Sequence, residues 1–85
     1  MITIKIFGTT PPCAKCKRAE REAQKAAASF GGQVQVLKLD ALGPEAQSYG
    51  VIMTPTIVMN DRIVVAGSIA SAEQLAKQIN EILGG

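Results

Sequence analysis

Residues 2–40 contain a strand pattern, a long helix pattern and a second strand pattern in succession, and this order constrains the fold most. Residues 2–7 alternate isoleucines with other side chains, as a strand does, before the segment 8–12 breaks the alternation with threonines and prolines. Residues 13–30 are strong helix formers. Residues 33–40 are typical of a second, largely buried strand. The helix is long enough for a crossover, so the segment predicts a βαβ unit with parallel strands.

The following residues predict a short helix and a hairpin. Pro44 can open the helix at its first turn, and Gly50 can close it. Residues 54–59 and 62–66 are rich in strand formers, and the Asn-Asp pair between them tolerates the left-handed backbone of a two-residue turn. We therefore expect two neighbouring antiparallel strands.

The C-terminal residues predict an amphipathic helix that begins with a capping box. Ser71 can cap the helix while Gln74 reaches back to it. The apolar stripe comprises Leu75, Ile79, Ile82 and Leu83. The predicted order is β-α-β-α-β-β-α, an α/β fold with a mixed four-stranded sheet. At 85 residues we expect residues 1–85 to form a single domain.

Composition narrows the function classes. The formal net charge is only +2 and three aromatic side chains occur, so we expect no nucleic-acid partner. The N-terminal residues lack a basic segment followed by a continuous apolar run, and no stretch approaches the roughly 18 apolar residues of a membrane span. We expect a cytoplasmic protein with no membrane partner.

The chain has two cysteines, Cys13 and Cys16, in a C-x-x-C motif where a loop meets a helix. Unpaired N–H groups and the helix dipole stabilise a thiolate at this position, and Lys15 adds positive charge. Thiols in such motifs have pKa values lowered from roughly 8.5 to about 3.5–7.5. The motif predicts that Cys13 is the attacking thiolate and that Cys16, on the alanine-rich face, is shielded and resolves the mixed disulfide.

Other interpretations of the same motif stay open. The two thiols could form a structural disulfide or be inert, although a bridge across such a short loop restrains the unfolded chain little. Two thiolates at this spacing also suit Cu(I) or Zn(II), so a soft-metal binding module is the alternative function. Domains that carry copper or mercury with this motif, however, end on a strand, whereas this chain ends on a helix.

A Thr-Pro pair at residues 54 and 55 completes a pattern that resembles the thioredoxin superfamily. The pattern is a strand, a C-x-x-C motif at a helix start, and a Thr-Pro opening a hairpin before a final helix. The chain is most similar to the minimal glutaredoxin-like thioredoxins, the redox-active disulfide protein family. The resemblance implies a thioredoxin-like three-layer fold and a cis Thr54–Pro55 bond facing the cysteines. Without the resemblance, Pro55 could be a trans proline that starts a strand.

The resemblance also implies how substrate is held. The backbone of Thr54 would pair with a substrate segment by strand addition, and Gly67 would let a substrate backbone approach. The expected substrate-binding residues are thus Thr54, Pro55, Lys15 and Gly67. Lys5 could lie beneath the site as a proton-handling group, but an exposed strand lysine is the preferred interpretation.

The predicted function is a thiol–disulfide oxidoreductase. Its expected partners are a disulfide-containing protein or small thiol as substrate, and a reductase or thiol as electron donor. The sequence lacks the Trp of the thioredoxin motif and the Gly-Gly-x-Asp glutathione signature of glutaredoxins, so it does not identify the donor. We expect no metal and no cofactor. A scaffold subunit without turnover, or a dimer that bridges an iron–sulfur cluster, is the least favoured hypothesis.

Overall fold

The computed structural model describes residues 2–9, 14–51 and 53–84. Four strands, three α-helices and one short 3₁₀ helix follow one another in these residues. In chain order they are β1 (Ile2–Gly8), α1 (Ala14–Ala28), η1 (Gly31–Gln33), β2 (Val34–Asp40), α2 (Pro44–Tyr49), β3 (Thr56–Met59), β4 (Arg62–Ala66) and α3 (Ala72–Gly84). The predicted order of strands and α-helices is confirmed.

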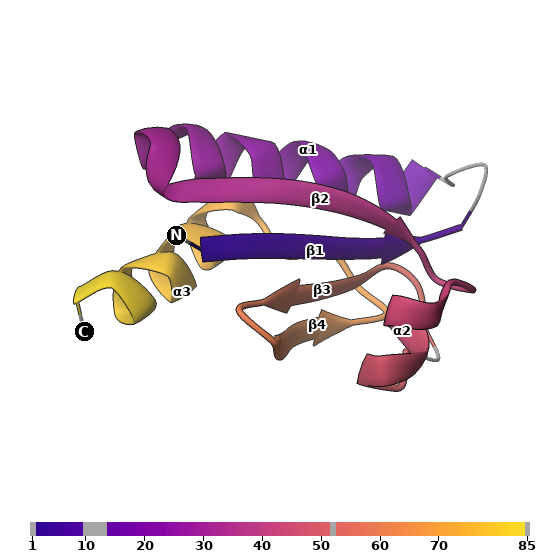
Figure 1. The fold of residues 1–85 in the computed structure, drawn as a ribbon. Coiled ribbons are helices and arrows are strands. Elements are labelled where there is room, and N and C mark those ends of the chain that lie inside the picture. Colours follow the sequence, from indigo (N-terminus) through magenta and orange to yellow (C-terminus); the bar gives the residue numbers. More distant parts are fainter. Residues whose placement is uncertain (1, 10–13, 52, 85) are drawn as a thin grey trace.

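The strands form one mixed sheet in the order β2-β1-β3-β4 (Figure 1). β1 pairs in parallel with β2, as the helical crossover predicts. β3 lies antiparallel to β1 on its other side, and β4 completes the hairpin at the edge. β1 is therefore a central strand, which explains why its isoleucines are buried.

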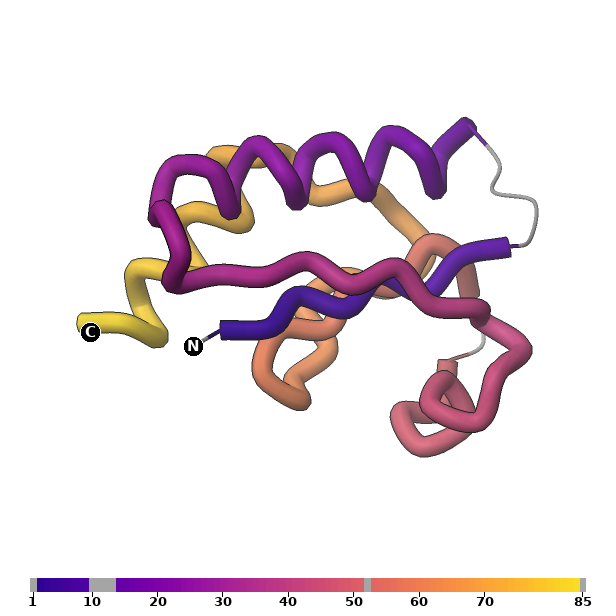
Figure 2. The backbone as a smooth tube through the Cα atoms, turned by 45° about the horizontal axis from the view of Figure 1, so that its top comes forward, coloured from indigo at the N-terminus to yellow at the C-terminus, as the bar shows by residue number. Residues whose placement is uncertain are grey.

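The main core lies between the sheet and two helices, α1 and α3. Figure 2 shows α1 running along the sheet as an outer layer, with α3 beside it. The isoleucines of β1 meet small alanines of α1, which let the helix approach the sheet closely, and Leu75 and Ile79 of α3 fill the rest. The α1 residues in this core are Ala19, Ala23 and Ala26.

A smaller core lies on the opposite face of the sheet. Phe7 of β1 points away from the isoleucines and packs with Val58 of β3 and Ala46 of α2. The ring of Tyr49 lies 5.7 Å from that of Phe7, centroid to centroid. Because α2 is short, it covers only one end of this face. α2 is the third layer of the fold.

The prediction that the second strand is largely buried is wrong. Only Val34 of β2 is buried, and Leu37 is 40% exposed. β2 is an edge strand, and α2 does not extend far enough to cover its outer face. An apolar run alone does not distinguish a strand covered on both faces from an edge strand covered on one.

The predicted turns and caps are present in the structure. Asn60 and Asp61 both have positive φ, 48° and 67°, as the two-residue hairpin turn requires. Gly50 ends α2 in the left-handed conformation. The Thr54-Pro55 pair was predicted to open a strand. Pro55 instead precedes β3, which begins at Thr56. None of the described helices has the length and apolarity that crossing a membrane requires.

Candidate active site

The candidate site lies at the end of the sheet where β1 leads toward α1. Cys13, the predicted attacking cysteine, lies outside the described residues, as do residues 10–12. Cys16 is described, in the first turn of α1, and is 1% exposed. Its burial agrees with the expectation that it falls on the alanine-rich face. Its sulfur lies 4.0 Å from the hydroxyl of Thr9, at the distance of a weak hydrogen bond.

Gly8, the last residue of β1, makes room for the Cys16 sulfur. A Cβ atom built on Gly8 would lie 3.0 Å from Sγ of Cys16 and 3.2 Å from its Cβ. Such a contact is tighter than nearly all that real side chains make, so any other residue at this position would displace the sulfur. From the sequence, Gly8 was expected only to begin the segment 8–12 that breaks the strand alternation. A glycine at the end of the strand before the C-x-x-C motif was the available signal.

Strand register brings Pro55 and Gly67 to the same end of the sheet as Gly8. Phe7 pairs with Thr56, and Thr56 pairs with Ala66. Gly8 follows Phe7, Pro55 precedes Thr56 and Gly67 follows Ala66, so these three residues lie at the same end of the sheet. The carbonyl of Pro55 accepts a hydrogen bond from the N–H of Gly67 at 2.9 Å. The structure therefore brings together two of the four predicted substrate-binding residues.

The Thr54–Pro55 peptide bond is cis, as the family resemblance implies. Pro55 is buried and Thr54 is partly exposed. The hydroxyl of Thr56 donates to the carbonyl of Met53, and this bond closes the turn that leads into β3. The turn presents the backbone around Thr54 at the edge of the candidate site.

Met53 covers Gly67, a contact that the sequence did not predict. Gly67 has φ of +79°, and a Cβ atom there would lie 3.1 Å from the sulfur of Met53. Met53 is 50% exposed, so its flexible thioether borders the surface next to Pro55 and Gly67. Nothing in the periodicity of either segment indicates that the two residues meet.

The two predicted lysines differ in their surroundings. Lys15 is exposed in the first turn of α1. Lys5, on β1, is not a solvated strand lysine, because its ammonium lies 3.0 Å from the Glu45 carboxylate and 3.2 Å from the Tyr49 hydroxyl. The hydrogen bond with Glu45, followed by that with Tyr49, raises the pKa of Lys5. Lys5 therefore joins α2 to the sheet.

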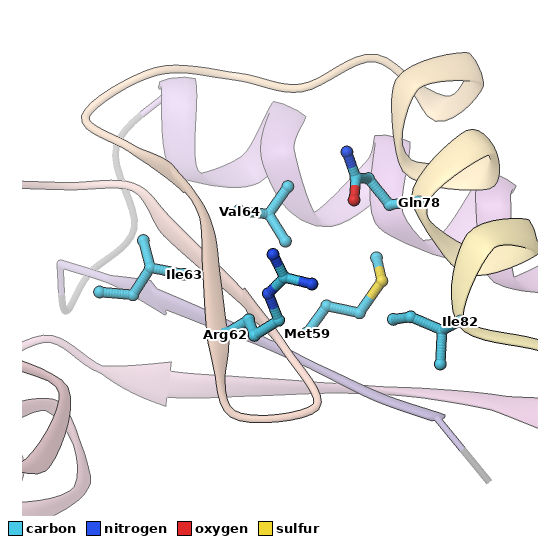
Figure 3. A pocket seen from close by; sticks show the side chains of 6 residues that line it. All are labelled: Met59, Arg62, Ile63, Val64, Gln78 and Ile82. Carbon is cyan, nitrogen blue, oxygen red and sulfur yellow. The ribbon is translucent and has the colours of Figure 1, made fainter. Parts of the chain in front are cut away.

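No group of three or more His, Cys, Asp or Glu side chains within residues 2–9, 14–51 and 53–84 could hold a metal ion. A pocket of about 240 Å³ lies elsewhere, between the hairpin and α3, with Met59 at its base and Arg62 and Gln78 among its walls (Figure 3). It contains none of the residues predicted for the site.

Comparison with known proteins identifies the family. The family described as thioredoxin domain matches residues 2–80. A thioredoxin from Methanocaldococcus jannaschii is 31% identical over 85 residues, which cover 100% of this chain and 94% of that protein. The chain belongs to the thioredoxin family. Thioredoxins are thiol–disulfide oxidoreductases, and membership assigns this general reaction class to the chain.

Several solved structures share the fold at lower identity. Chloroplastic thioredoxin z has a TM-score of 0.81 at 23% identity, over 100% of this chain and 80% of that chain. A malarial protein has a TM-score of 0.76 at 23% identity, and the match covers 98% of each chain. Thioredoxin-2 of the malaria parasite has a TM-score of 0.76 at 22% identity, over 95% of this chain and 82% of that chain. At these identities the likeness shows the thioredoxin fold alone.

Proposed function

We propose that this thioredoxin reduces or exchanges disulfides through Cys13 and Cys16. The thiolate of Cys13 attacks one sulfur of a substrate disulfide, which forms a mixed disulfide and releases the other substrate sulfur as a thiolate. Cys16 then loses its proton and attacks Cys13, and the second substrate thiolate leaves. Two electrons pass to the substrate, its two sulfurs take up protons, and the enzyme keeps a Cys13–Cys16 disulfide.

The observation that carries this proposal is the place of Cys16. A resolving thiol must stay out of reach of other reagents and yet lie one helical turn from the attacking thiol. Cys16 is 1% exposed and packs against the space that Gly8 leaves, and the C-x-x-C motif puts Cys13 three residues before it in the sequence. An attacking thiol needs the opposite, because a substrate disulfide has to reach it.

Substrate would bind beside the cysteines along the backbone of Thr54. Thr54, next to the buried Pro55, is partly exposed at the site edge, where an extended segment can add to its backbone. Gly67, held by Pro55, adds no side chain of its own to this edge, where the thioether of Met53 also lies. The substrate is a protein or small-molecule disulfide, and a cytoplasmic reductase or thiol returns the enzyme to its dithiol form.

Trapping the mixed disulfide tests the proposal. The Cys16→Ser variant of the full chain, mixed with a peptide disulfide, should accumulate a covalent adduct at Cys13 that mass spectrometry detects. The matched Cys13→Ser variant should form none, since its buried thiol cannot reach the substrate. The wild-type chain should reduce the same peptide with a chemical dithiol as the electron source.

Two results would overturn the proposal. One is an adduct that forms equally with both variants. The other is a pair of thiols that react slowly with alkylating reagents and are protected only by added Cu(I) or Zn(II). The second result would favour the soft-metal binding module.

A further inference from the structure

The outer face of α1 carries a net basic surface in the same turns of the helix as Cys16. Figures 1 and 2 show α1 as an outer layer with no other element over its solvent side. The buried residues of the helix face the sheet, and its first two turns expose a set of basic side chains on the other side. We call this set the α1 basic face; it comprises Lys15, Lys17, Arg18 and Arg21.

The acidic residues of α1 neutralise this face only in part, since of its four members only Arg18 is close enough to act on the charge of Glu22. Glu20 pairs with Lys38 of β2 at 3.6 Å, and Glu22 accepts a hydrogen bond from the backbone of α3 and pairs with Lys25. Both carboxylates are thus directed to the flanks of the helix. In the part of the chain that the structure describes, no residue of the α1 basic face forms an ion pair.

The basic face lies close enough to Cys16 along the helix axis to act on a reacting partner. At a rise of about 1.5 Å per residue, Arg21 is about 8 Å along the helix from Cys16. This distance is comparable with the Debye length of about 8 Å at physiological ionic strength, so salt does not fully screen the face from a partner at the sulfurs.

Two acidic side chains near this end of the sheet, Asp40 and Glu45, already have partners within the protein. Asp40, paired with Gly8 in the sheet register, accepts the N–H of Leu42 at 2.8 Å. Glu45 lies on α2, beyond the opposite face, and binds Lys5. Leu42 itself is 89% exposed and adds an apolar contact point beyond the end of β2.

We propose that the α1 basic face docks an acidic segment of the disulfide-bearing protein that this thioredoxin reduces. The inference rests on the proposed function and adds the charge of the partner to it. A protein is the fitting partner because the reaction requires a disulfide, and opposite charge steers it to the sulfurs. A nucleic acid fits less well, since only three aromatic residues occur in the chain and Phe7 is fully buried.

Three peptides that share one disulfide-closed ring test the proposal. Their flanking residues are glutamates, glutamines or lysines, and the second-order rate of reduction is measured for each with the full chain. At low ionic strength we expect the acidic peptide to react about tenfold faster than the basic one, with the neutral peptide between them. The three rates should converge as salt is added, because the attraction is screened.

Charge reversal identifies the surface. The triple variant Lys17→Glu, Arg18→Glu, Arg21→Glu should reverse the order of the acidic and basic peptides. The matched control is Lys77→Glu, an exposed charge reversal on α3, which should leave the order unchanged. Ratios between peptides are compared within each variant, because a charge near Cys13 alters the reactivity of the thiol toward every substrate equally.

The outcomes separate this inference from the proposed function. Equal rates for the three peptides, or an order that the triple variant does not alter, would refute the docking surface and leave the oxidoreductase intact. No reduction of any peptide would refute the proposed function itself. If the triple variant fails to fold, Lys17→Glu alone must narrow the ratio. A single-stranded oligonucleotide that binds this face more tightly than the acidic peptide at physiological salt would show that the partner class is wrong.

Discussion

The carboxylate of Glu22 in α1 accepts a hydrogen bond of 2.9 Å from the backbone N–H of Ala72, the first residue of α3. The first N–H groups of a helix have no partner within it, so this bond satisfies one of them from a different element. It also places a negative charge at the positive end of the α3 dipole. The contact joins the two helices that cover the main core.

Glu22 should make stability depend on acidity. The hydrogen bond from Ala72 holds the pKa of Glu22 below its usual value. Because the folded pKa is the lower one, the stabilisation is fully present above the unfolded pKa and is lost as the pH falls through the folded pKa. Urea unfolding across the acidic range should show that Glu22→Gln removes part of this loss. Glu20→Gln, on the same helix but paired with Lys38, should retain it.

The capping box of α3 should stabilise the fold independently. The side chain of Ser71 accepts from the N–H of Gln74 at 3.2 Å, and the side chain of Gln74 accepts from the N–H of Ser71 at 3.0 Å. Ser71→Ala should lower the free energy of unfolding by about 1 kcal/mol, as loss of an N-cap does. Urea unfolding of Ser71→Ala, of Gln74→Ala and of the double variant should show that the two substitutions are coupled. Strict additivity would mean that the two bonds do not act as a unit.

Replacement of Gly8 should disturb Cys16 directly. In Gly8→Ala the new methyl group would lie 3.0 Å from the sulfur of Cys16, so the sulfur or the strand must shift. Such overpacking costs about 1–3 kcal/mol of stability. We also expect slower release of substrate from the mixed disulfide, measured by rapid-quench alkylation. Gly32→Ala is the matched control, because nothing lies within 4 Å of a Cβ there. Equal behaviour of the two variants would contradict the role of Gly8.

Gly67 should tolerate a side chain less well than Gly50 does. Both have positive φ, +79° and +67°, which costs an alanine roughly 1–2 kcal/mol. Only Gly67 has a neighbour, the sulfur of Met53, within contact distance of the added carbon. Chemical denaturation should therefore show a larger loss for Gly67→Ala than for Gly50→Ala. The excess should shrink when Gly67→Ala is made in a Met53→Gly background, which removes the Met53 Cβ at 3.2 Å as well as the sulfur. An unchanged excess would locate the cost elsewhere.

Local patterns in the sequence were sufficient to predict the fold. The alternating isoleucines of β1, the turn at Asn60-Asp61 and the Ser71 cap depend on residues that are close in the chain, and each lies where it was predicted. The thioredoxin resemblance rested on the order of these elements together with the C-x-x-C motif and the Thr54-Pro55 pair, and the family match confirms it.

The contacts between distant segments could not be predicted. The approach of Gly8 to Cys16, the cover of Met53 over Gly67 and the hold of Lys5 on Glu45 depend on how elements pack in space. The hydrophobic periodicity of the two contacting segments does not indicate such a contact. The burial of β2 was mispredicted for the same reason, since its place at the sheet edge is a property of the whole sheet. The role of Cys13 stays a prediction because that residue lies outside the described part of the chain.

The central place of β1 in the sheet has a consequence for how the molecule assembles during synthesis. β1 is synthesised before β2 and β3, and in the finished sheet it is hydrogen-bonded to both of them, one on each side. The pairing with β2 can form early, but the second edge of β1 stays open until β3 has been made. A nascent chain that pauses between β2 and β3 thus exposes an apolar strand edge, the feature that promotes aggregation. Completion of the second half of the chain removes that exposure.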